Sequence, residues 1–200
     1  MNRTISMCGV VLSLMFVAAC NDKDADAVSH ASPQRSGKKL TLPPAGADYK
    51  VIGVKDGLSG YIIQYDDKLY RGGQMNTAKG LDYLKDLGVT TVITITPTED
   101  ERKYVPAEGM TLVEVPFDKK DGPSPETLKT FMDAVKASKG PVYVHCHGGT
   151  HRAAILAGLY RIWAHGWDFN RTAVEFGTLG GDLKGDHEML VRIRKYAESL

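Results

Sequence analysis

Short stretches rich in β-branched residues alternate with stretches of helical periodicity from about residue 60 to the end of the chain. In the clearest strand pattern, Val89–Ile95, Val, Ile and Thr fill every position, which is typical of a buried strand. In the clearest helical pattern, Leu81, Leu84 and Leu87 share one face and Gly88 follows as a stop signal. The same signals predict a hairpin at 60–69, strands at 89–95, 111–115 and 142–144, one helical turn at 99–104, and helices at 77–86, 152–165, 170–176, 186–199 and from 125 onward. Strands that alternate with helices predict an α/β fold, with a central, mainly parallel sheet flanked by helices.

The amino-terminal 47 residues follow a different pattern. Arg3 is followed by an apolar run, Met7–Ala19, which at 13 residues is too short to span a bilayer and has the layout of a secretory signal. Residues 20–47 contain almost no large apolar side chain, so they cannot bury enough surface to offset the entropy of ordering them. We predict a signal peptide at 1–19, a flexible tether at 20–47 and one folded domain at 48–200.

The predicted signal ends in Val17-Ala18-Ala19-Cys20, which resembles the lipobox of bacterial lipoproteins. The resemblance implies cleavage before Cys20, lipid on its sulfur and amino group, and a membrane anchor that does not readily dissociate. On this interpretation the chain is an exported, membrane-anchored lipoprotein that faces the periplasm or the cell exterior. The alternative is an ordinary signal peptide in which Cys20 is incidental.

Charge and cysteine content narrow the function classes. The chain has 25 basic and 24 acidic side chains, a net charge of +1, whereas a protein that binds the nucleic-acid backbone normally has a basic excess. We therefore expect no nucleic-acid partner. Of three cysteines, Cys8 lies in the predicted signal and Cys20 at the predicted lipid site, so Cys146 is the one thiol of the predicted domain. An unpaired thiol is a liability in an oxidising compartment, which indicates that Cys146 has a use.

The segment His145–Arg152 contains that thiol, between a predicted strand and a predicted helix. Ligands of open α/β sheets bind at the carboxyl ends of the strands, where Cys146 is expected to lie. The following backbone N–H groups and the helix dipole can form an anion cradle, which the fork of Arg152 can close around a phosphate. The predicted phosphate-binding residues are His147, Gly148, Gly149, Thr150, His151 and Arg152. The same positive field favours the thiolate of Cys146, placed for in-line attack on phosphorus.

This order of residues, His-Cys, five residues and Arg, resembles the signature loop of the cysteine-based protein tyrosine phosphatases, and the domain is similar to their dual-specificity branch, including small exported bacterial members. The likeness extends to Leu69–Gln74, Leu84–Ile93, Gly158–Ile162 and Gly166-Trp167. It implies a phosphatase-like α/β fold and hydrolysis of phosphomonoesters, phosphotyrosine first and phosphoserine or phosphothreonine as further substrates. It also implies a phosphocysteine intermediate on Cys146, phosphate binding by Arg152, and no metal or cofactor. The implied partner is a phosphorylated protein or a small phosphomonoester.

The family also uses an aspartate, on a loop roughly 25 to 35 residues before the cysteine, to protonate the leaving group. In this chain Asp121 precedes Cys146 by 25 residues and Asp118 by 28. The Asp-Gly-Pro-Ser context of Asp121 is more similar to the family's acid loop, although a Pro-Phe-Asp context like that of Asp118 also has precedent. The resemblance therefore implies Asp121 as the general acid. Asp118 is the alternative, and the other interpretation makes both of them solvated loop charges.

One position departs from the family pattern. The residue after the signature arginine is usually Ser or Thr, whose hydroxyl hydrogen-bonds the departing thiolate when the phosphoenzyme is hydrolysed. This chain has Ala153 there. The expected consequence is slower breakdown of the phosphocysteine intermediate, with the first chemical step retained.

Three other functions share part of this pattern. Phosphoinositide and other non-protein phosphatases have the same loop, but often with lysines, where this chain has His147 and His151. Arsenate reductases also use Cys, five residues and Arg, but their extra redox cysteines are missing from the predicted domain. A non-catalytic phosphate-binding module is the third alternative, because of Ala153 and the ambiguous acid.

The remaining features are interpreted as structural. The histidines and cysteine of 145–151 are metal-ligand types, but their spacing does not match the usual paired ligands and Arg152 would oppose a cation, so we expect no metal site. Arg71 is expected to make structural hydrogen bonds. We expect the aromatic residues Trp163, Trp167 and Phe176 in packing, and residues 99–103 on a solvated face.

Overall fold

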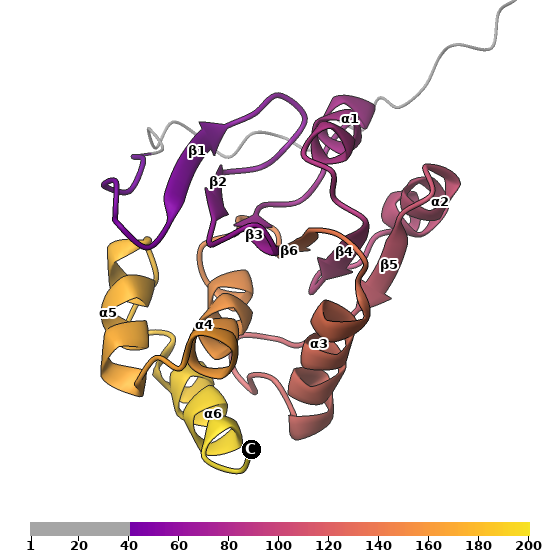
Figure 1. The fold of residues 1–200 in the computed structure, drawn as a ribbon. Helices are drawn as coiled ribbons and strands as arrows, with labels where there is room; N and C mark the ends of the chain where they lie inside the picture. The colour runs from indigo at the N-terminus through magenta and orange to yellow at the C-terminus, as the bar shows by residue number, and fades with distance from the viewer. Residues whose placement is uncertain (1–40) are drawn as a thin grey trace, which may run out of the picture. The chain divides into compact units, whose positions relative to one another are not determined.

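The computed structural model describes residues 41–200, and a six-stranded sheet in the order β1-β2-β3-β6-β4-β5 forms the centre of this part (Figure 1). The strands are β1 (Lys50–Val54), β2 (Tyr61–Gln64), β3 (Leu69–Gly72), β4 (Thr91–Thr94), β5 (Thr111–Glu114) and β6 (Val142–His145). The helices are α1 (Ala78–Asp86), α2 (Glu99–Ala107), α3 (Pro125–Ala137), α4 (Arg152–His165), α5 (Phe169–Thr178) and α6 (His187–Ala197).

Residues 1–40, which include the predicted signal peptide, Cys20 and most of the predicted tether, lie outside the described residues. The predicted domain boundaries therefore stay predictions. Within residues 41–200, no helix is both long enough and apolar enough to cross a membrane.

The sheet is parallel around its inner strand. β6 pairs in parallel with β3 on one side and with β4 on the other, and β4 pairs in parallel with β5. The predicted hairpin is present as the antiparallel pair β2–β3, and β1 adds an antiparallel edge strand. The predicted α/β class, with helices around a mainly parallel sheet, is confirmed. Because β6 lies between two parallel neighbours, its carboxyl end opens at the edge of the sheet where ligands bind in such folds.

Helices cover both faces of the sheet (Figure 1). α1 and α2 lie on one face, where Leu84 and Val105 pack with Ile62 and Val92 in an apolar cluster. α3, α4, α5 and α6 lie on the other face over a larger cluster. Every residue of α4 from Ala153 to Arg161 is buried, so packing on all sides fixes the position of this helix.

The helix boundaries follow local capping signals. Ser124 accepts a hydrogen bond from the backbone of Thr127 and Pro125 takes the first helical position, so α3 begins where the sequence predicts. α4 ends at Gly166, whose φ of 64° is the left-handed conformation that glycine adopts at helix ends. The predicted single turn at 99–104 is longer in the structure, where α2 runs from Glu99 to Ala107.

The sequence analysis misses strand β1. Its five residues, Lys50–Val54, contain a glycine at φ 92°, and the pairing with β2 shifts register between Val51 and Gly53. A short edge strand with a bulge lacks the regular alternation that identifies a strand in sequence. β1 lies at the far edge from the parallel part of the sheet, so its omission does not alter the predicted site.

Buried polar contacts hold the carboxyl-terminal half of α4. The hydroxyl of Tyr160 donates a 2.6 Å hydrogen bond to Asp66 in the β2–β3 turn. The guanidinium of Arg161 pairs with Glu175 of α5 at 2.8 Å and lies 4.3 Å from the ring centroid of Trp167. These contacts satisfy an arginine that is almost completely buried, as a buried charge requires. They fix the far end of the helix whose first turn begins the candidate site.

The predicted structural roles of Arg71 and of three aromatic residues are confirmed. Trp167 and Phe176 are buried, and Trp163 packs against the larger apolar cluster. Arg71 is fully buried. Its Nη2 makes the structural hydrogen bond, to the carbonyl oxygen of Leu179 at 3.2 Å, whereas its Nε and Nη1 have no hydrogen-bond partner among residues 41–200.

Candidate active site

Cys146 directly follows β6 and is 4% exposed. The next two residues, His147 and Gly148, are exposed, so the chain reaches the surface at the residue after Cys146. We call residues 146–152 the phosphate loop. It connects the carboxyl end of the inner strand to α4, as the sequence predicts.

Close backbone contacts with the end of β3 shape this loop. Gly149 has a φ of 77°, and a Cβ atom there would lie 2.4 Å from the carbonyl carbon of Gly72. Gln74 donates its backbone N–H to the carbonyl oxygen of His147 at 3.1 Å. A side chain at Gly149 would be excluded on both counts, because the left-handed conformation and the close approach each favour glycine. Gly148 has no such constraint, since a Cβ atom there would meet nothing within 4 Å.

The phosphate loop contains a run of backbone N–H groups, those of residues 147–151, that are unpaired within the part of the chain that the structure describes. Among residues 41–200, none of the N–H groups of residues 147–151 donates a hydrogen bond to another protein atom. The loop leads into the amino terminus of α4, where the first N–H groups have no partner in the helix and the dipole is positive. Backbone donors need acceptors, and an anion supplies them. The arrangement therefore suits a phosphate group bound at the loop that begins with Cys146.

The side chain of Arg152 connects this loop to a second one. Its Nη1 donates to the carbonyl oxygen of Phe117 at 3.2 Å. We call residues 116–124 the acid loop, because it contains both of the predicted acids. The two loops are far apart in sequence, but this hydrogen bond makes them neighbours in the fold, so the loop that contains the predicted acids contacts the predicted phosphate ligand Arg152.

The two candidate acids differ in their surroundings. The backbone N–H of Asp121 donates to Oδ1 of Asp118 at 2.7 Å, and this hydrogen bond holds the pKa of the Asp118 carboxyl below its usual range. A carboxylate that is stabilised in its ionised form is a poor proton donor. The carboxyl group of Asp118 shapes the loop, which leaves Asp121, also exposed, as the better candidate for the acid.

A third acidic residue near the site, Asp186, was not predicted from the sequence as a site residue. It precedes α6, and its side chain is fully buried. Oδ1 lies 2.7 Å from Nζ of Lys119 in the acid loop, and Oδ2 lies 2.6 Å from Nδ1 of His151 in the phosphate loop. The sequence marks Asp186 only as the start of a helix, and no local pattern connects it to either loop.

Glu101 corrects the predicted solvated face at 99–103. This side chain is 3% exposed, and its Oε1 lies 3.2 Å from Nε2 of the buried His145. Glu101 also closes a capping box with Thr98 at the start of α2. The Thr98-x-x-Glu101 spacing is a recognised helix-start pattern, so the capping box could have been predicted from the sequence. The contact between Glu101 and His145 could not, because it depends on tertiary structure.

The histidines of the signature have separate surroundings. His145 contacts Glu101, His151 contacts Asp186, and His147 is exposed. Within residues 41–200 there is no group of three or more His, Cys, Asp or Glu side chains that could hold a metal ion.

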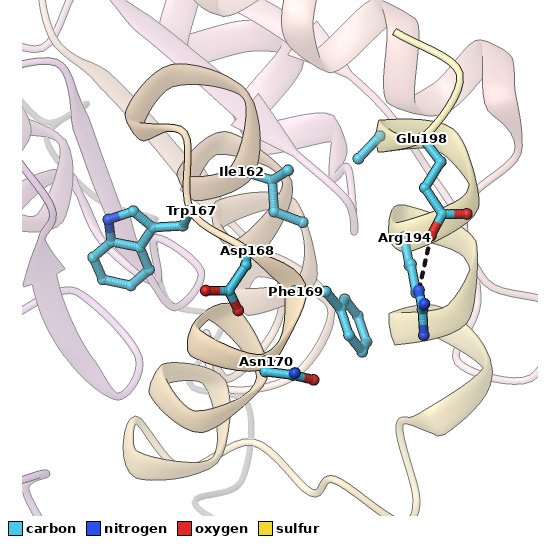
Figure 2. Close-up of a pocket in the computed structure, with 8 residues that line it drawn as sticks. Ile162, Trp167, Asp168, Phe169, Asn170, Arg194 and Glu198 are labelled. Atoms are coloured by element: carbon cyan, nitrogen blue, oxygen red, sulfur yellow. Dashed lines mark hydrogen bonds and ion pairs between the residues drawn. The ribbon is translucent and has the colours of Figure 1, made fainter.

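A pocket of about 380 Å³ lies elsewhere, between the carboxyl-terminal parts of α4 and α6 and the start of α5 (Figure 2). Its lining includes Ile162, Trp167, Asp168, Phe169, Asn170 and Arg194. Arg194 donates to Glu198 at 2.9 Å across one side of it (Figure 2). None of the predicted site residues lines this pocket, so it is distinct from the phosphate loop.

Comparison with known proteins agrees with this geometry. Residues 55–182 match the family model described as "DSP-PTPase phosphatase fused to NAD+ Kinase". The dual specificity protein phosphatase TpbA of Pseudomonas aeruginosa strain UCBPP-PA14 is 31% identical over 114 residues, which are 56% of this chain and 51% of TpbA. The chain thus spans about half the length of that relative.

Solved structures show the same fold. The crystal structure of P. aeruginosa TpbA aligns with a TM-score of 0.61 at 20% identity, over 74% of this chain and 94% of that one. The crystal structure of a DUF442 protein of Shewanella putrefaciens CN-32 aligns with a TM-score of 0.57 at 22% identity, over 72% of this chain and 91% of that one. The family model confirms the resemblance noted from the signature loop. Since the family model covers well over half of the chain, the chain belongs to the dual-specificity branch of the cysteine-based protein tyrosine phosphatases.

Proposed function

We propose that the chain is a phosphatase that hydrolyses phosphomonoesters through a phosphocysteine intermediate on Cys146. The observation that carries the proposal is the phosphate loop with its unpaired backbone N–H groups. A buried thiol lies at the base of a loop whose N–H groups have no acceptor among the described residues, at the amino terminus of α4. Preorganised donors of this kind stabilise the charge of a transferring phosphoryl group.

The reaction then has two displacements. In the first, Sγ of Cys146 attacks phosphorus, the bond from phosphorus to the ester oxygen breaks, and Asp121 gives its proton to the leaving oxygen. Arg152 and the N–H groups of the phosphate loop hold the three phosphoryl oxygens meanwhile. In the second, Asp121 takes a proton from water, the water oxygen attacks phosphorus, and the S–P bond breaks to release inorganic phosphate and the thiolate.

Phosphotyrosine is the substrate that we propose first, with phosphoserine and phosphothreonine after it. P. aeruginosa TpbA, which has the same fold, has a structure in complex with phosphotyrosine. In this chain, Nζ of Lys119 in the acid loop pairs with the buried carboxylate of Asp186, which also contacts Nδ1 of His151 in the phosphate loop. This pairing reduces the positive charge available for a second phosphate group, which favours a phosphorylated protein over a polyphosphorylated lipid headgroup.

Phosphate release from para-nitrophenyl phosphate and from a phosphotyrosine peptide tests the proposal, with the Cys146→Ser variant as the control. Turnover that resists a chelator and is lost in the variant supports it. Absence of turnover, with tungstate binding that depends on Arg152, would instead identify a phosphate-binding module. Faster release from a phosphoinositide vesicle than from the peptide would reassign the substrate to the lipid class.

We further propose that the chain is exported and held at a membrane through lipid on Cys20. The support is the sequence Val17-Ala18-Ala19-Cys20 after an apolar run. Mass spectrometry of the amino-terminal peptide from cells tests it. A peptide that begins at Cys20 and carries acyl chains supports the anchor, whereas an unmodified Cys20 in a longer or shorter peptide contradicts it.

A further inference from the structure

Asp186 touches the two functional loops with one carboxylate. The ion pairs described above join its Oδ1 to Lys119 of the acid loop at 2.7 Å and its Oδ2 to His151 of the phosphate loop at 2.6 Å. Three segments that are distant in sequence therefore meet at one side chain. The backbone N–H of Asp182 adds a 3.1 Å hydrogen bond to Oδ2, which fixes the carboxylate from its own segment.

Burial makes this contact more than an incidental surface pair. The side chain of Asp186 is 0% exposed, while those of Lys119 and His151 are 45% and 40% exposed. A buried carboxylate requires partners for the hydration that it has lost, and removing one leaves its charge poorly compensated. The carboxylate is thus the fixed point, and the half-exposed side chains of Lys119 and His151 are held to it.

The positions of Lys119 and His151 in the sequence give the contact a consequence for catalysis. Lys119 is next to Asp118 and two residues before Asp121, and His151 directly precedes Arg152. The other contact between the loops, from Arg152 to the carbonyl oxygen of Phe117, uses an N–H group of the fork that the proposed mechanism directs to phosphate. When a phosphate draws on that fork, the pairs through Asp186 still join the acid loop to the phosphate loop.

We propose that Asp186 is a positioning residue that holds the acid loop against the phosphate loop, so that protonation of the leaving group depends on it. This inference rests on the proposed phosphatase function. Asp186 acts through Lys119 and His151. A shift of about 1 Å in a catalytic group can cost on the order of a hundredfold in rate. Without the carboxylate, the acid loop would sample positions from which Asp121 cannot reach the leaving oxygen.

The test compares two aryl phosphates that differ in their need for an acid. Phenoxide, like the tyrosine side chain with a pKa of about 10, leaves only with a proton, whereas 2,4-dinitrophenoxide leaves readily without one. The full chain and its Asp186→Asn variant are assayed for kcat/KM, which reports the first displacement and is independent of phosphocysteine breakdown. We expect kcat/KM for phenyl phosphate to fall by about tenfold or more, against less than about threefold for 2,4-dinitrophenyl phosphate. Inhibition by vanadate, which needs only the phosphate loop, should stay within about twofold.

Two further variants separate this role from a general loss of structure. Lys119→Met removes the acid-loop partner from a half-exposed position and should reproduce the selective loss, and the double variant should be no worse than either single one. Glu188→Gln removes a charge from an exposed position in the first turn of α6, two residues after Asp186, so the ratio of the two substrates should not change. If Asp186→Asn does not fold, Lys119→Met decides the question.

Equal losses on both substrates, or weaker vanadate inhibition, would place Asp186 in support of the phosphate loop alone and overturn the proposal. An unchanged ratio in both Asp186→Asn and Lys119→Met would also overturn it. Failure of the underlying function has a different signature, because the unaltered chain would then turn over neither substrate.

Discussion

Nε2 of His145 lies 3.2 Å from Oε1 of Glu101, and both side chains are buried. His145 is the last residue of β6 and the residue before Cys146, so the pair adjoins the strand end that leads to the proposed nucleophile. Burial raises the pKa of Glu101 to about 7 and lowers the pKa of His145 to about 4. Between these values both side chains are uncharged, and the proton of the pair belongs to the carboxyl group.

The pair predicts an unusual pH dependence of stability. The raised pKa of Glu101 contributes stability that is complete below its unfolded value of about 4.5 and is lost as pH rises through about 7. The lowered pKa of His145 contributes stability that is complete above about 6.5 and is lost as pH falls through about 4. The two contributions oppose each other, so they largely offset in the unaltered chain.

Glu101→Gln removes one side of this balance. Relative to the unaltered chain, the variant should gain free energy of unfolding as pH rises from 4.5 to 7.5, by up to about 3 kcal/mol. The reason is that each pH unit between the unfolded and folded pKa values of Glu101 is worth about 1.4 kcal/mol. Urea denaturation at pH 4.5, 6.0 and 7.5 measures the difference. A gap between the two proteins that does not change with pH would contradict the assignment of the proton to Glu101.

The geometry of the phosphate loop predicts that alanine substitution lowers the free energy of unfolding at Gly149 but hardly changes it at Gly148. Gly149→Ala places a Cβ atom 2.4 Å from the carbonyl carbon of Gly72 at a φ of 77°, so the loop or the end of β3 must shift. We expect a loss of unfolding free energy on the order of 2 kcal/mol, from strain in the left-handed region and overpacking. Gly148→Ala meets nothing within 4 Å and should change stability by less than about 0.5 kcal/mol. Thermal denaturation of both variants checks this, and equal effects would show that the loop conformation is not constrained by β3.

Asp118 and Asp121 give a matched pair for the general acid. Asp121→Asn removes the proposed proton donor, and we expect kcat/KM for phenyl phosphate to fall by about a hundredfold. Asp118→Asn retains an oxygen that can accept the 2.7 Å hydrogen bond from the backbone of Asp121, so the loop keeps its shape and the rate should fall far less. The pH-rate profiles of the two variants are the measurement. If only Asp118→Asn loses the fall in rate at high pH, Asp118 is the general acid and Asp121 is not.

How far the site could be predicted from sequence depended on where its parts lie along the chain. The cysteine, the loop amides and Arg152 lie within seven residues, so their type and spacing identify them without a fold. The family resemblance favoured Asp121 over Asp118 as the acid from its sequence context, and the hydrogen bond from the backbone of Asp121 to Asp118 adds a physical reason for the same choice.

Asp186 and Glu101 show what local patterns omit. Asp186 contacts His151 from 35 residues away, and Glu101 contacts His145 from 44 residues away. Each looks like a helix-start residue in sequence, because acidic side chains are common there. Their burial arises from tertiary packing, through the pairing of β4 with β6 for Glu101 and the packing of α6 against α4 for Asp186.

Ala153 allows the two displacements to be separated kinetically. It is the second residue of α4, fully buried in the same apolar cluster as Cys146, in the position where the family usually has a hydroxyl. Ala153→Ser should therefore speed phosphocysteine breakdown and raise the steady-state rate several-fold, while the first displacement keeps its rate. Ala154→Ser, which buries the same hydroxyl at the next position, is the control and should not accelerate turnover. Rapid-quench measurement of the burst and of the steady state distinguishes the steps. If Ala153→Ser changes neither the burst nor the steady-state rate, the missing hydroxyl does not limit phosphocysteine breakdown in this chain, and another group must stabilise the departing thiolate.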